Sequence, residues 1–159
     1  MAIAYIALGS NLKTPAQQVK QALIALQGLP ETRLLQHSSL YQTEPVGYDN
    51  QPDFINAVAQ LDTALEPHLL LEKLLEIETE FGRERPFPNA PRVLDLDLLM
   101  YDDLVIDSNV LSVPHPRMHL RGFVMLPLAE IAPDITIPKI GRVEDLLAKL
   151  DVSDIKKLN

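Results

Sequence analysis

The sequence predicts one α+β domain, a sandwich of helices and a mainly antiparallel sheet. Its 159 residues, 47% of them hydrophobic, can form a single core that buries roughly 70% of the surface of the unfolded chain. The expected elements follow the order strand, helix, strand, strand, helix, strand, which is that of a ferredoxin-like, split β-α-β unit. The last third of the chain adds a hairpin and helices. We therefore expect a ferredoxin-like α/β sandwich with helices on both faces of the sheet, in one domain over residues 1–159.

The first half of the chain begins with a strand and a helix. Residues 3–8 form an apolar run that ends at Gly9-Ser10-Asn11, a pattern typical of a buried strand and a turn. Thr14 suits the N-cap of the next helix, and Pro15 suits its first position. Residues 33–42 lie between chain breakers and predict the second strand.

The second half of the chain continues the alternation of strands and helices. Strict alternation of two sets of side chains predicts strands, and leucines three and four residues apart predict helices. The expected elements are a strand over 54–61, a helix from Pro67 to Gly82, a strand over 93–101, its hairpin partner over 104–106, and helices over 123–131 and 143–150.

Two proline-rich segments, 44–52 and 83–92, contain too many chain breakers for regular structure. Long loops in compact domains are often functional. We expect both segments to be mobile in the free protein and to become ordered only when the ligands of the site are bound.

The composition excludes several classes of protein. Without cysteine, the chain has no disulfides, thiolate nucleophiles or cysteine-rich zinc sites, so hard cations are the expected metals. With 14 Lys and Arg against 22 Asp and Glu, it lacks the basic surface that broad nucleic-acid binding needs. It has no apolar run near the ~20 residues that span a bilayer, and no signal-peptide pattern. We expect a cytoplasmic, monomeric protein that acts on small molecules.

Positive charge is concentrated in one part of this acidic chain. Five of the seven arginines lie between residues 83 and 121. This concentration favours a site for phosphate groups, and the alternative is a set of solvated surface charges. The five are Arg83, Arg85, Arg92, Arg117 and Arg121.

Asp95 and Asp97 form the strongest local signal. Residues two apart on a strand point to the same face, so these carboxylates should lie together while Leu94, Leu96 and Leu98 face the core. Two close carboxylates repel each other unless a cation neutralises them, and Mg²⁺ takes its other ligands from water and substrate phosphates. Together with the arginines, the pair indicates phosphoryl or nucleotidyl chemistry. The alternative is an exposed strand face that carries acids.

Two further patterns concern phosphate and metal binding. His115 and His119 have the spacing of metal ligands on a helix, but Pro114 and Pro116 disfavour a helix there. His115 is therefore expected to donate a hydrogen bond to a phosphate. The chain has no P-loop or Rossmann glycine pattern, and Gly9-Ser10-Asn11 resembles only part of a phosphate loop.

Two aromatic residues and one amide suggest a site for a flat ligand. Phe54 and Phe123 could sandwich such a ligand, although a core position is the alternative for each. Asn56 shares a strand face with Phe54, and its amide can both donate to and accept from a heterocycle.

Five segments stand in a family-like order and spacing: ALGSNL at 7–12, YQTEPVG at 41–47, QPDFINA at 51–57, PRVLDLD at 91–97, and VPHPRM at 113–118 with RGFV at 121–124. Through them the whole chain resembles the 6-hydroxymethyl-7,8-dihydropterin pyrophosphokinases of folate biosynthesis. The resemblance implies transfer of the β,γ-pyrophosphoryl group of ATP to the hydroxymethyl group of the pterin, with release of AMP and with two Mg²⁺ ions.

The resemblance also implies roles for individual residues. Asp95 and Asp97 would hold both magnesium ions, and Arg83 and Arg92 would bind phosphate and close the loop as further catalytic residues. The nucleotide positions would be Glu78, Arg85, Leu98, Ser112, His115 and Arg121. The pterin positions would be Thr43, Glu44, Val46, Phe54, Asn56 and Phe123.

Two other classes of function stay open from the sequence. A nucleotidyltransferase would use the same paired Asp residues and Mg²⁺ but would attack the α-phosphorus of ATP. A non-catalytic ferredoxin-like binding or regulatory domain would need no metal at all.

Overall fold

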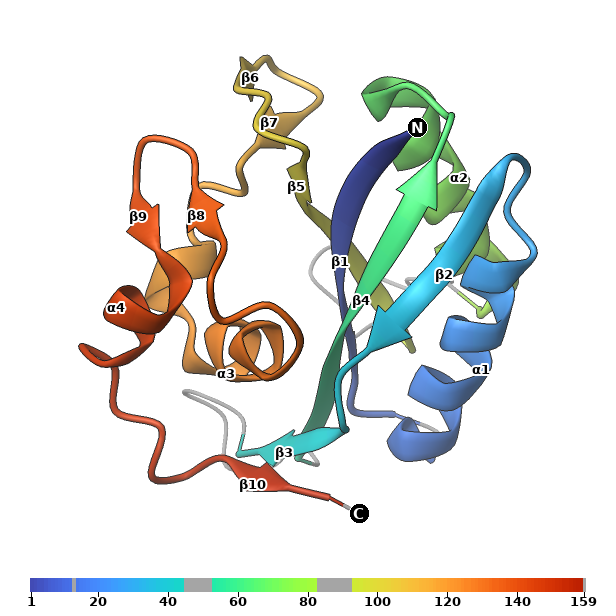
Figure 1. Cartoon of the computed structure of the whole chain (residues 1–159). Helices are drawn as coiled ribbons and strands as arrows, with labels where there is room; N and C mark the ends of the chain where they lie inside the picture. The colour runs from blue at the N-terminus through green and yellow to red at the C-terminus, as the bar shows by residue number, and fades with distance from the viewer. Residues whose placement is uncertain (13, 45–52, 83–92, 159) are drawn as a thin grey trace.

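A six-stranded sheet forms the centre of the computed structural model (Figure 1). The structure describes residues 1–12, 14–44, 53–82 and 93–158. The strand order is β10-β3-β4-β1-β5, β2 also pairs with β4, and every pair is antiparallel. This sheet confirms the predicted ferredoxin-like arrangement, with the second strand of the unit divided in two. The strands are β1 (Ala2–Ser10), β2 (Thr32–His37), β3 (Tyr41–Thr43), β4 (Phe54–Thr63), β5 (Asp95–Tyr101) and β10 (Lys156–Lys157).

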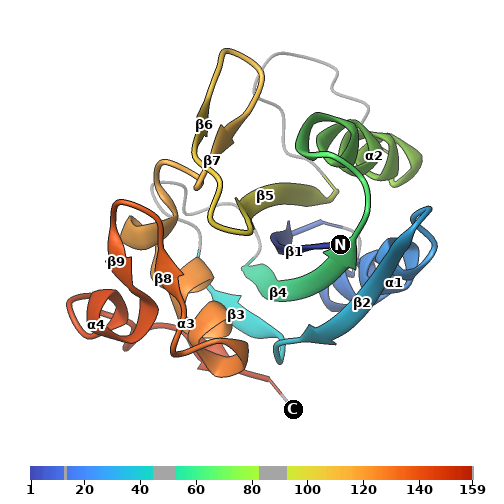
Figure 2. The ribbon, with the colours of Figure 1, turned by 45° about the horizontal axis from the view of Figure 1, so that its top comes forward.

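Helices cover both faces of the sheet, as predicted (Figure 2). On one face lie α1 (Pro15–Gln27) and α2 (Pro67–Glu80), and on the other lie α3 (Gly122–Ile131) and α4 (Val143–Leu147). The smaller elements are the hairpin strands β6 (Ile106–Asp107), β7 (Ser112–Val113), β8 (Thr136–Ile137) and β9 (Gly141–Arg142), and the 3-10 helix η1 (Met118–Leu120). In the described part of the chain, no helix has both the length and the apolar character needed to cross a membrane.

The face under α1 and α2 is an apolar core. Alternation along β1 directs Ala4, Ile6 and Leu8 into it, where they join Leu70 and Leu74 of α2, and none of these residues is more than 1% exposed. Each fully buried leucine or isoleucine contributes about 1.5–3 kcal/mol relative to an exposed one. This face holds the sheet rigid from behind.

A second core lies under α3 and covers only part of the opposite face. Tyr5 of β1 and Val58 of β4 pack there against Met125 of α3. The register between β1 and β5 shifts between Tyr5 and Ile6, which pair with Met100 and Leu98. The intervening residue of β5 therefore has no partner on β1, and β5 bends at this bulge.

Two strand predictions need correction. The predicted strand over 33–42 is interrupted, because Ser38 leaves the ladder: its N–H donates to the Val58 carbonyl at 2.8 Å and its Oγ accepts from the Val58 N–H at 2.9 Å. The predicted turn at Gly9-Ser10-Asn11 is wrong in its first two residues, since β1 continues through Ser10.

The predicted pairing of 104–106 with the preceding strand is also wrong, because β6 pairs with β7. The cause lies at Asp102, which has φ 49° and exchanges two hydrogen bonds with Ile3. Its N–H donates to the Ile3 carbonyl at 2.7 Å, and its Oδ1 accepts from the Ile3 N–H at 2.7 Å. These bonds tie the end of β5 to β1, and the chain then leaves the sheet.

Helix boundaries differ in smaller ways from the predicted ones. Thr14 does precede α1, but with φ 59° and no capping hydrogen bond from its side chain; its carbonyl accepts from the N–H groups of Gln17 and Gln18. Glu66 supplies the side-chain cap of α2, which the sequence did not single out. The C-terminal helix α4 ends at Leu147 rather than at residue 150.

Candidate active site

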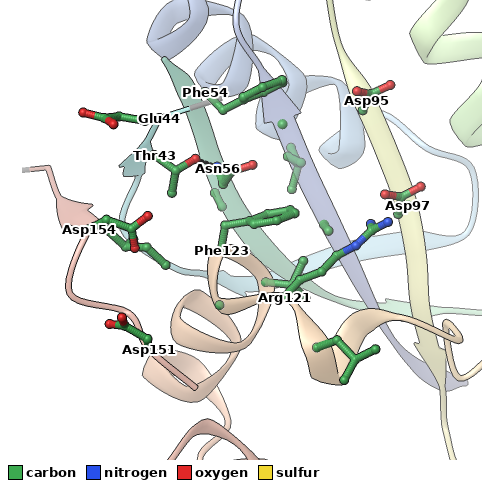
Figure 3. A pocket seen from close by; sticks show the side chains of 18 residues that line it. Thr43, Glu44, Phe54, Asn56, Asp95, Asp97, Arg121, Phe123, Asp151 and Asp154 are labelled. Atoms are coloured by element: carbon green, nitrogen blue, oxygen red, sulfur yellow. Dashed lines mark hydrogen bonds between the residues drawn. The ribbon is translucent and has the colours of Figure 1, made fainter. Parts of the chain in front are cut away.

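A cleft of about 540 Å³ opens on the part of the sheet that α3 leaves uncovered (Figure 3). Its floor consists of β4, β1 and β5, and its walls are the end of β3, the start of α3 and the C-terminal segment. Eight of the residues singled out in the sequence line it: Thr43, Glu44, Phe54, Asn56, Asp95, Asp97, Arg121 and Phe123.

Small residues in β1 make room for this cleft. Gly9 pairs with Asn56 of β4 on one side and with Asp95 of β5 on the other. A Cβ atom on Gly9 would lie 3.0 Å from Asn56 Oδ1, closer than Cβ contacts normally come. Gly9 therefore belongs to the floor of the cleft within a strand, and its partial likeness to a phosphate loop does not correspond to a loop in the structure.

One end of the cleft suits a flat heterocycle. The rings of Phe54 and Phe123 lie on opposite sides of the cavity, with Asn56 and Thr43 at the back between them (Figure 3). Asn56 and Thr43 are 7% and 8% exposed, and Asn56 Nδ2 donates to Thr43 Oγ1 at 3.2 Å. Aromatic faces and a buried amide together can stack on a ring and bond to its edge.

The other end of the cleft is charged. Asp95 and Asp97 of β5 line this end, while Leu96 and Leu98 lie in the core on the opposite face, where they are 3% and 4% exposed. The predicted division of this strand into a carboxylate face and a leucine face is therefore confirmed. Arg121 reaches from the start of α3 toward Asp97 (Figure 3), and its guanidinium carbon lies 5.8 Å from the centroid of the Phe123 ring.

The carboxylates of Asp95 and Asp97 suit a hard cation whose other ligands come from water and a substrate. Among the described residues, no three His, Asp or Glu side chains converge on a potential metal position, so the protein alone forms no closed metal site there. Asp95 and Asp97 offer carboxylate oxygens at an open cleft. Mg²⁺ commonly binds in this way, through one or two carboxylates, several waters and phosphate oxygens.

Burial and two nearby arginines disfavour the charged form of His115. Burial lowers its pKa below the ordinary value of 6.5, and the positive charges of Arg121 and Arg117 act in the same direction, although Asp97 opposes them. Its Nδ1 accepts from the N–H of Arg117 at 3.1 Å, so in the neutral ring the proton is on Nε2. The N–H of His115 donates to the Leu99 carbonyl at 2.8 Å, which fixes this turn beside β5.

Four predicted nucleotide positions, Glu78, Leu98, Ser112 and His115, do not line the cleft. The Glu78 side chain is 2% exposed, and its Oε2 accepts from the N–H of Leu96 at 2.7 Å, which joins α2 to β5. Leu98 points into the core, so only its main chain is available to a ligand on the cleft side. Ser112 lies in β7, opposite Asp107.

Four other predicted positions lie outside the described residues. They are Val46, Arg83, Arg85 and Arg92, and with them lie all of the proline-rich segment 83–92 and all of 44–52 except Glu44. The expectations for these residues and for loop closure stay predictions.

The sequence reasoning missed one wall of the cleft. Asp151, Asp154 and Ile155 line it from the C-terminal segment, next to Gly122. They have the i, i+3, i+4 spacing of a helix face but form no helix and belong to no motif, so only the path of the chain brings them to the site. Gly122 lay within a recognised motif but was given no role.

Comparison with known proteins adds to this geometry. The model of the 7,8-dihydro-6-hydroxymethylpterin-pyrophosphokinase (HPPK) family matches residues 5–133. The chain belongs to this family. A 2-amino-4-hydroxy-6-hydroxymethyldihydropteridine pyrophosphokinase of Pseudomonas aeruginosa is 46% identical over 154 residues, covering 97% of this chain and 95% of the relative. An enzyme of the same name from Haemophilus influenzae is 44% identical over 159 residues, covering 100% of this chain and 99% of the relative.

Solved structures share the fold of this HPPK chain. Wild-type Plasmodium falciparum HPPK-DHPS, crystallised with pterin and p-hydroxybenzoate, matches with a TM-score of 0.76 and 16% identity over 98% of this chain. The match covers 46% of the Plasmodium chain, so this chain spans less than half of that longer protein. At this identity the likeness concerns the fold alone.

Proposed function

We propose that this chain transfers the pyrophosphoryl group of ATP to the 6-hydroxymethyl group of 7,8-dihydropterin, with release of AMP, in folate biosynthesis. Its membership of the HPPK family and its full-length similarity to two pyrophosphokinases support this reaction. The observation that carries it is that one cleft contains two aromatic rings with a buried amide at one end and two carboxylates with an arginine at the other. A pterin and a polyphosphate need these two kinds of surface side by side.

The aromatic end would bind and orient the pterin. Phe54 and Phe123 would stack on its two faces, and Asn56 would bond to its edge, with the main chain around Thr43 and Glu44 beside it. This orientation directs the hydroxymethyl group along the floor of the cleft, past Gly9 and toward Asp95. A fixed approach of this kind removes much of the entropic cost of bringing two substrates together.

The charged end would bind the triphosphate. Asp95 and Asp97 would hold two Mg²⁺ ions, which when bound neutralise phosphate charge and orient the β-phosphorus. Arg121 and the Nε2–H of His115 would donate to phosphate oxygens, as would Arg83, Arg85 and Arg92 from the loop before β5. Glu78, Leu98, Ser112 and Val46 complete the proposed set, the first three on the nucleotide side and the last beside the pterin.

The reaction itself is a displacement at the β-phosphorus. The hydroxymethyl oxygen forms a bond to that phosphorus, the bond from the phosphorus to the α,β-bridging oxygen breaks, and AMP leaves with the bridging oxygen while the hydroxyl proton passes to solvent. Arginines placed around the phosphates stabilise charge that moves onto the leaving oxygen. Water is a competing nucleophile, so closure of the cleft would protect ATP from hydrolysis.

Identification of the nucleotide product tests this function. ATP labelled in the adenine ring would be incubated with the chain and Mg²⁺, with and without 6-hydroxymethyl-7,8-dihydropterin. We expect AMP to form in equal amount to the pterin diphosphate, and only when both the pterin and Mg²⁺ are present. Transfer of the adenine label onto the pterin, with release of unlabelled pyrophosphate, would identify a nucleotidyltransferase instead, and binding of both ligands without any product would identify a non-catalytic module.

A further inference from the structure

The C-terminal segment over residues 151–158, here called the C-terminal strap, connects two walls of the cleft. It continues from α4, runs beneath α3 and ends beside β3 (Figure 1). Three of its residues, Asp151, Asp154 and Ile155, line the cleft. The strap lies beyond the part of the chain that the family model matches.

Main-chain hydrogen bonds anchor the strap at its far end. Strand β10 pairs with β3, with Lys156 opposite Gln42 and Lys157 opposite Tyr41. The N–H of Leu158 then donates to the Leu40 carbonyl at 2.7 Å. Strand β3 ends in Thr43, which lines the cleft and accepts a hydrogen bond from Asn56. The strap is therefore fixed to the strand that carries this partner of Asn56.

Side chains of the strap pack directly against the start of α3. A Cβ atom on Gly122 would lie 3.0 Å from Val152 Cγ1 and 3.1 Å from Ile155 Cδ1. The φ angle of Gly122 is not positive, so any residue could adopt its backbone conformation. The strap alone therefore limits the size of residue 122, and it does so one residue before Phe123.

We infer that the C-terminal strap positions Phe123 for the pterin, through Val152 and Ile155 packed on Gly122. The guanidinium carbon of Arg121 lies 5.8 Å from the centroid of the Phe123 ring. The ring is therefore placed between this cation and the strap, which is anchored to β3. The gap between Phe123 and Phe54 is then set by how closely Gly122 and the strap approach each other. Val152 and Ile155 are positioning residues that act through Phe123. This inference rests on the proposed use of the cleft for a pterin.

Alanine at residue 122 tests the inference. Gly122→Ala should push Phe123 or the strap aside and weaken binding of 6-hydroxymethylpterin roughly tenfold, the size of one overpacked contact. Affinity for a nonhydrolysable ATP analogue with Mg²⁺ should fall clearly less than pterin affinity, because the carboxylates of the charged end are on β5, across the floor from the strap, and only Arg121 of that end adjoins residue 122. Correspondingly, KM for the pterin should rise more than kcat falls. Both affinities are measurable by titration calorimetry on the full chain.

Compensating and matched variants make the test specific. Val152→Ala removes the contacting methyl group, so the double variant Gly122→Ala with Val152→Ala should recover most of the pterin affinity. Ile155→Ala should by itself weaken pterin binding by enlarging the gap. Ile24→Ala, at an isoleucine of α1 that is 66% exposed, should leave both affinities at the wild-type value.

Several results would overturn the inference. It is wrong if Gly122→Ala binds the pterin as the wild type does, if both ligands lose affinity equally, or if Val152→Ala gives no recovery. Should Gly122→Ala fail to fold by circular dichroism, unchanged pterin binding by Ile155→Ala would overturn it instead. Failure of the proposed function is distinguishable, because the wild-type chain itself would then either not bind the pterin or bind it without forming AMP.

Discussion

The two faces of the central sheet serve different purposes, although the same strands build both. On the face under α1 and α2, β1 presents Ala4, Ile6 and Leu8, all buried in an apolar core. On the opposite face the same strand presents Tyr5, Ala7 and Gly9, from a buried tyrosine in the core under α3 to progressively smaller residues at the cleft. One strand thus fills space on one side and leaves a cavity on the other.

Because of this difference, adjacent residues of one strand serve different purposes, one stability and the next function. Neighbouring residues of β5, such as Leu96 and Asp97, point to opposite faces, one into the core and one into the cleft. Because the site residues are carried by strands with a packed core behind them, their positions are fixed before any ligand binds. Substitutions on the core face should therefore lower stability, and substitutions on the cleft face should lower binding or turnover.

The largest effect is expected for the carboxylates of the cleft face. Asp95→Asn or Asp97→Asn should lower kcat by roughly 10²–10³-fold or more, because each removes charge that holds the metal and the phosphates. Thermal stability should be unchanged or higher, since two close carboxylates repel each other without a cation. Asp107→Asn, at an exposed position of β6, is the matched control. Near-normal turnover of either cleft variant at saturating Mg²⁺ would show that the pair has another role.

The core face should respond in the opposite way. Leu70→Ala should lower the free energy of unfolding by about 2–5 kcal/mol, because Leu70 is fully buried against the sheet. Its neighbour Leu69 is 37% exposed on the same helix, so Leu69→Ala should cost about 1 kcal/mol or less. Urea unfolding measures both values. Pterin affinity of the folded Leu70→Ala protein should stay at the wild-type level, and a large loss there would contradict the separation of the two faces.

On the cleft face, removal of one amide should distinguish pterin binding at one end from ATP binding at the other. Asn56→Ala should weaken pterin binding about tenfold or more and leave ATP binding nearly unchanged, since an unpaired buried group costs about 1–3 kcal/mol. Gln60→Ala is the control, because Gln60 shares that face of β4 but bonds to Gln36 and Tyr5 outside the cleft. Equal losses for both ligands would assign Asn56 a structural role through Thr43.

The smallest effect concerns acid stability at the end of α3. Burial tends to raise the pKa of Glu130, but hydrogen bonds from the Tyr41 hydroxyl and from the N–H and Oγ of Ser39, together with the charge of Lys157, lower it below the ordinary 4.5. The unfolded chain therefore binds this proton more readily. The stabilisation is present above pH 4.5 and is lost as the pH falls through the lowered pKa.

Tyr41→Phe isolates that contribution. It removes the hydroxyl that donates to Glu130, so the variant should lose less stability than the wild type when the pH falls from about 6 to 3. Unfolding by urea at a series of pH values gives the two slopes. Identical slopes would mean that Ser39 and Lys157 account for the lowered pKa without Tyr41.

Local patterns predicted the faces of the site residues on β4 and β5, and long-range contacts decided the rest. Two-residue alternation was enough to place Asp95 with Asp97 and Phe54 with Asn56, because it depends only on the strand itself. The partner of β6 was not predictable in this way, since it follows from the bonds between Asp102 and Ile3, residues far apart in sequence.

The C-terminal wall of the cleft was missed for the same reason. Val152 and Ile155 have a spacing of three residues but lie in no helix, and their place beside Gly122 depends on the pairing of β10 with β3. The element order did predict the ferredoxin-like sheet, because short connections and antiparallel neighbours leave few alternatives.

A crystal structure of the chain with Mg²⁺, a nonhydrolysable ATP analogue and 6-hydroxymethylpterin tests the central claim most directly. We expect the pterin between Phe54 and Phe123 with its edge on Asn56, its hydroxymethyl group toward the β-phosphorus, and the metal ions on Asp95 and Asp97. A pterin bound outside this cleft, or a triphosphate whose metal ions do not touch either carboxylate, would contradict it.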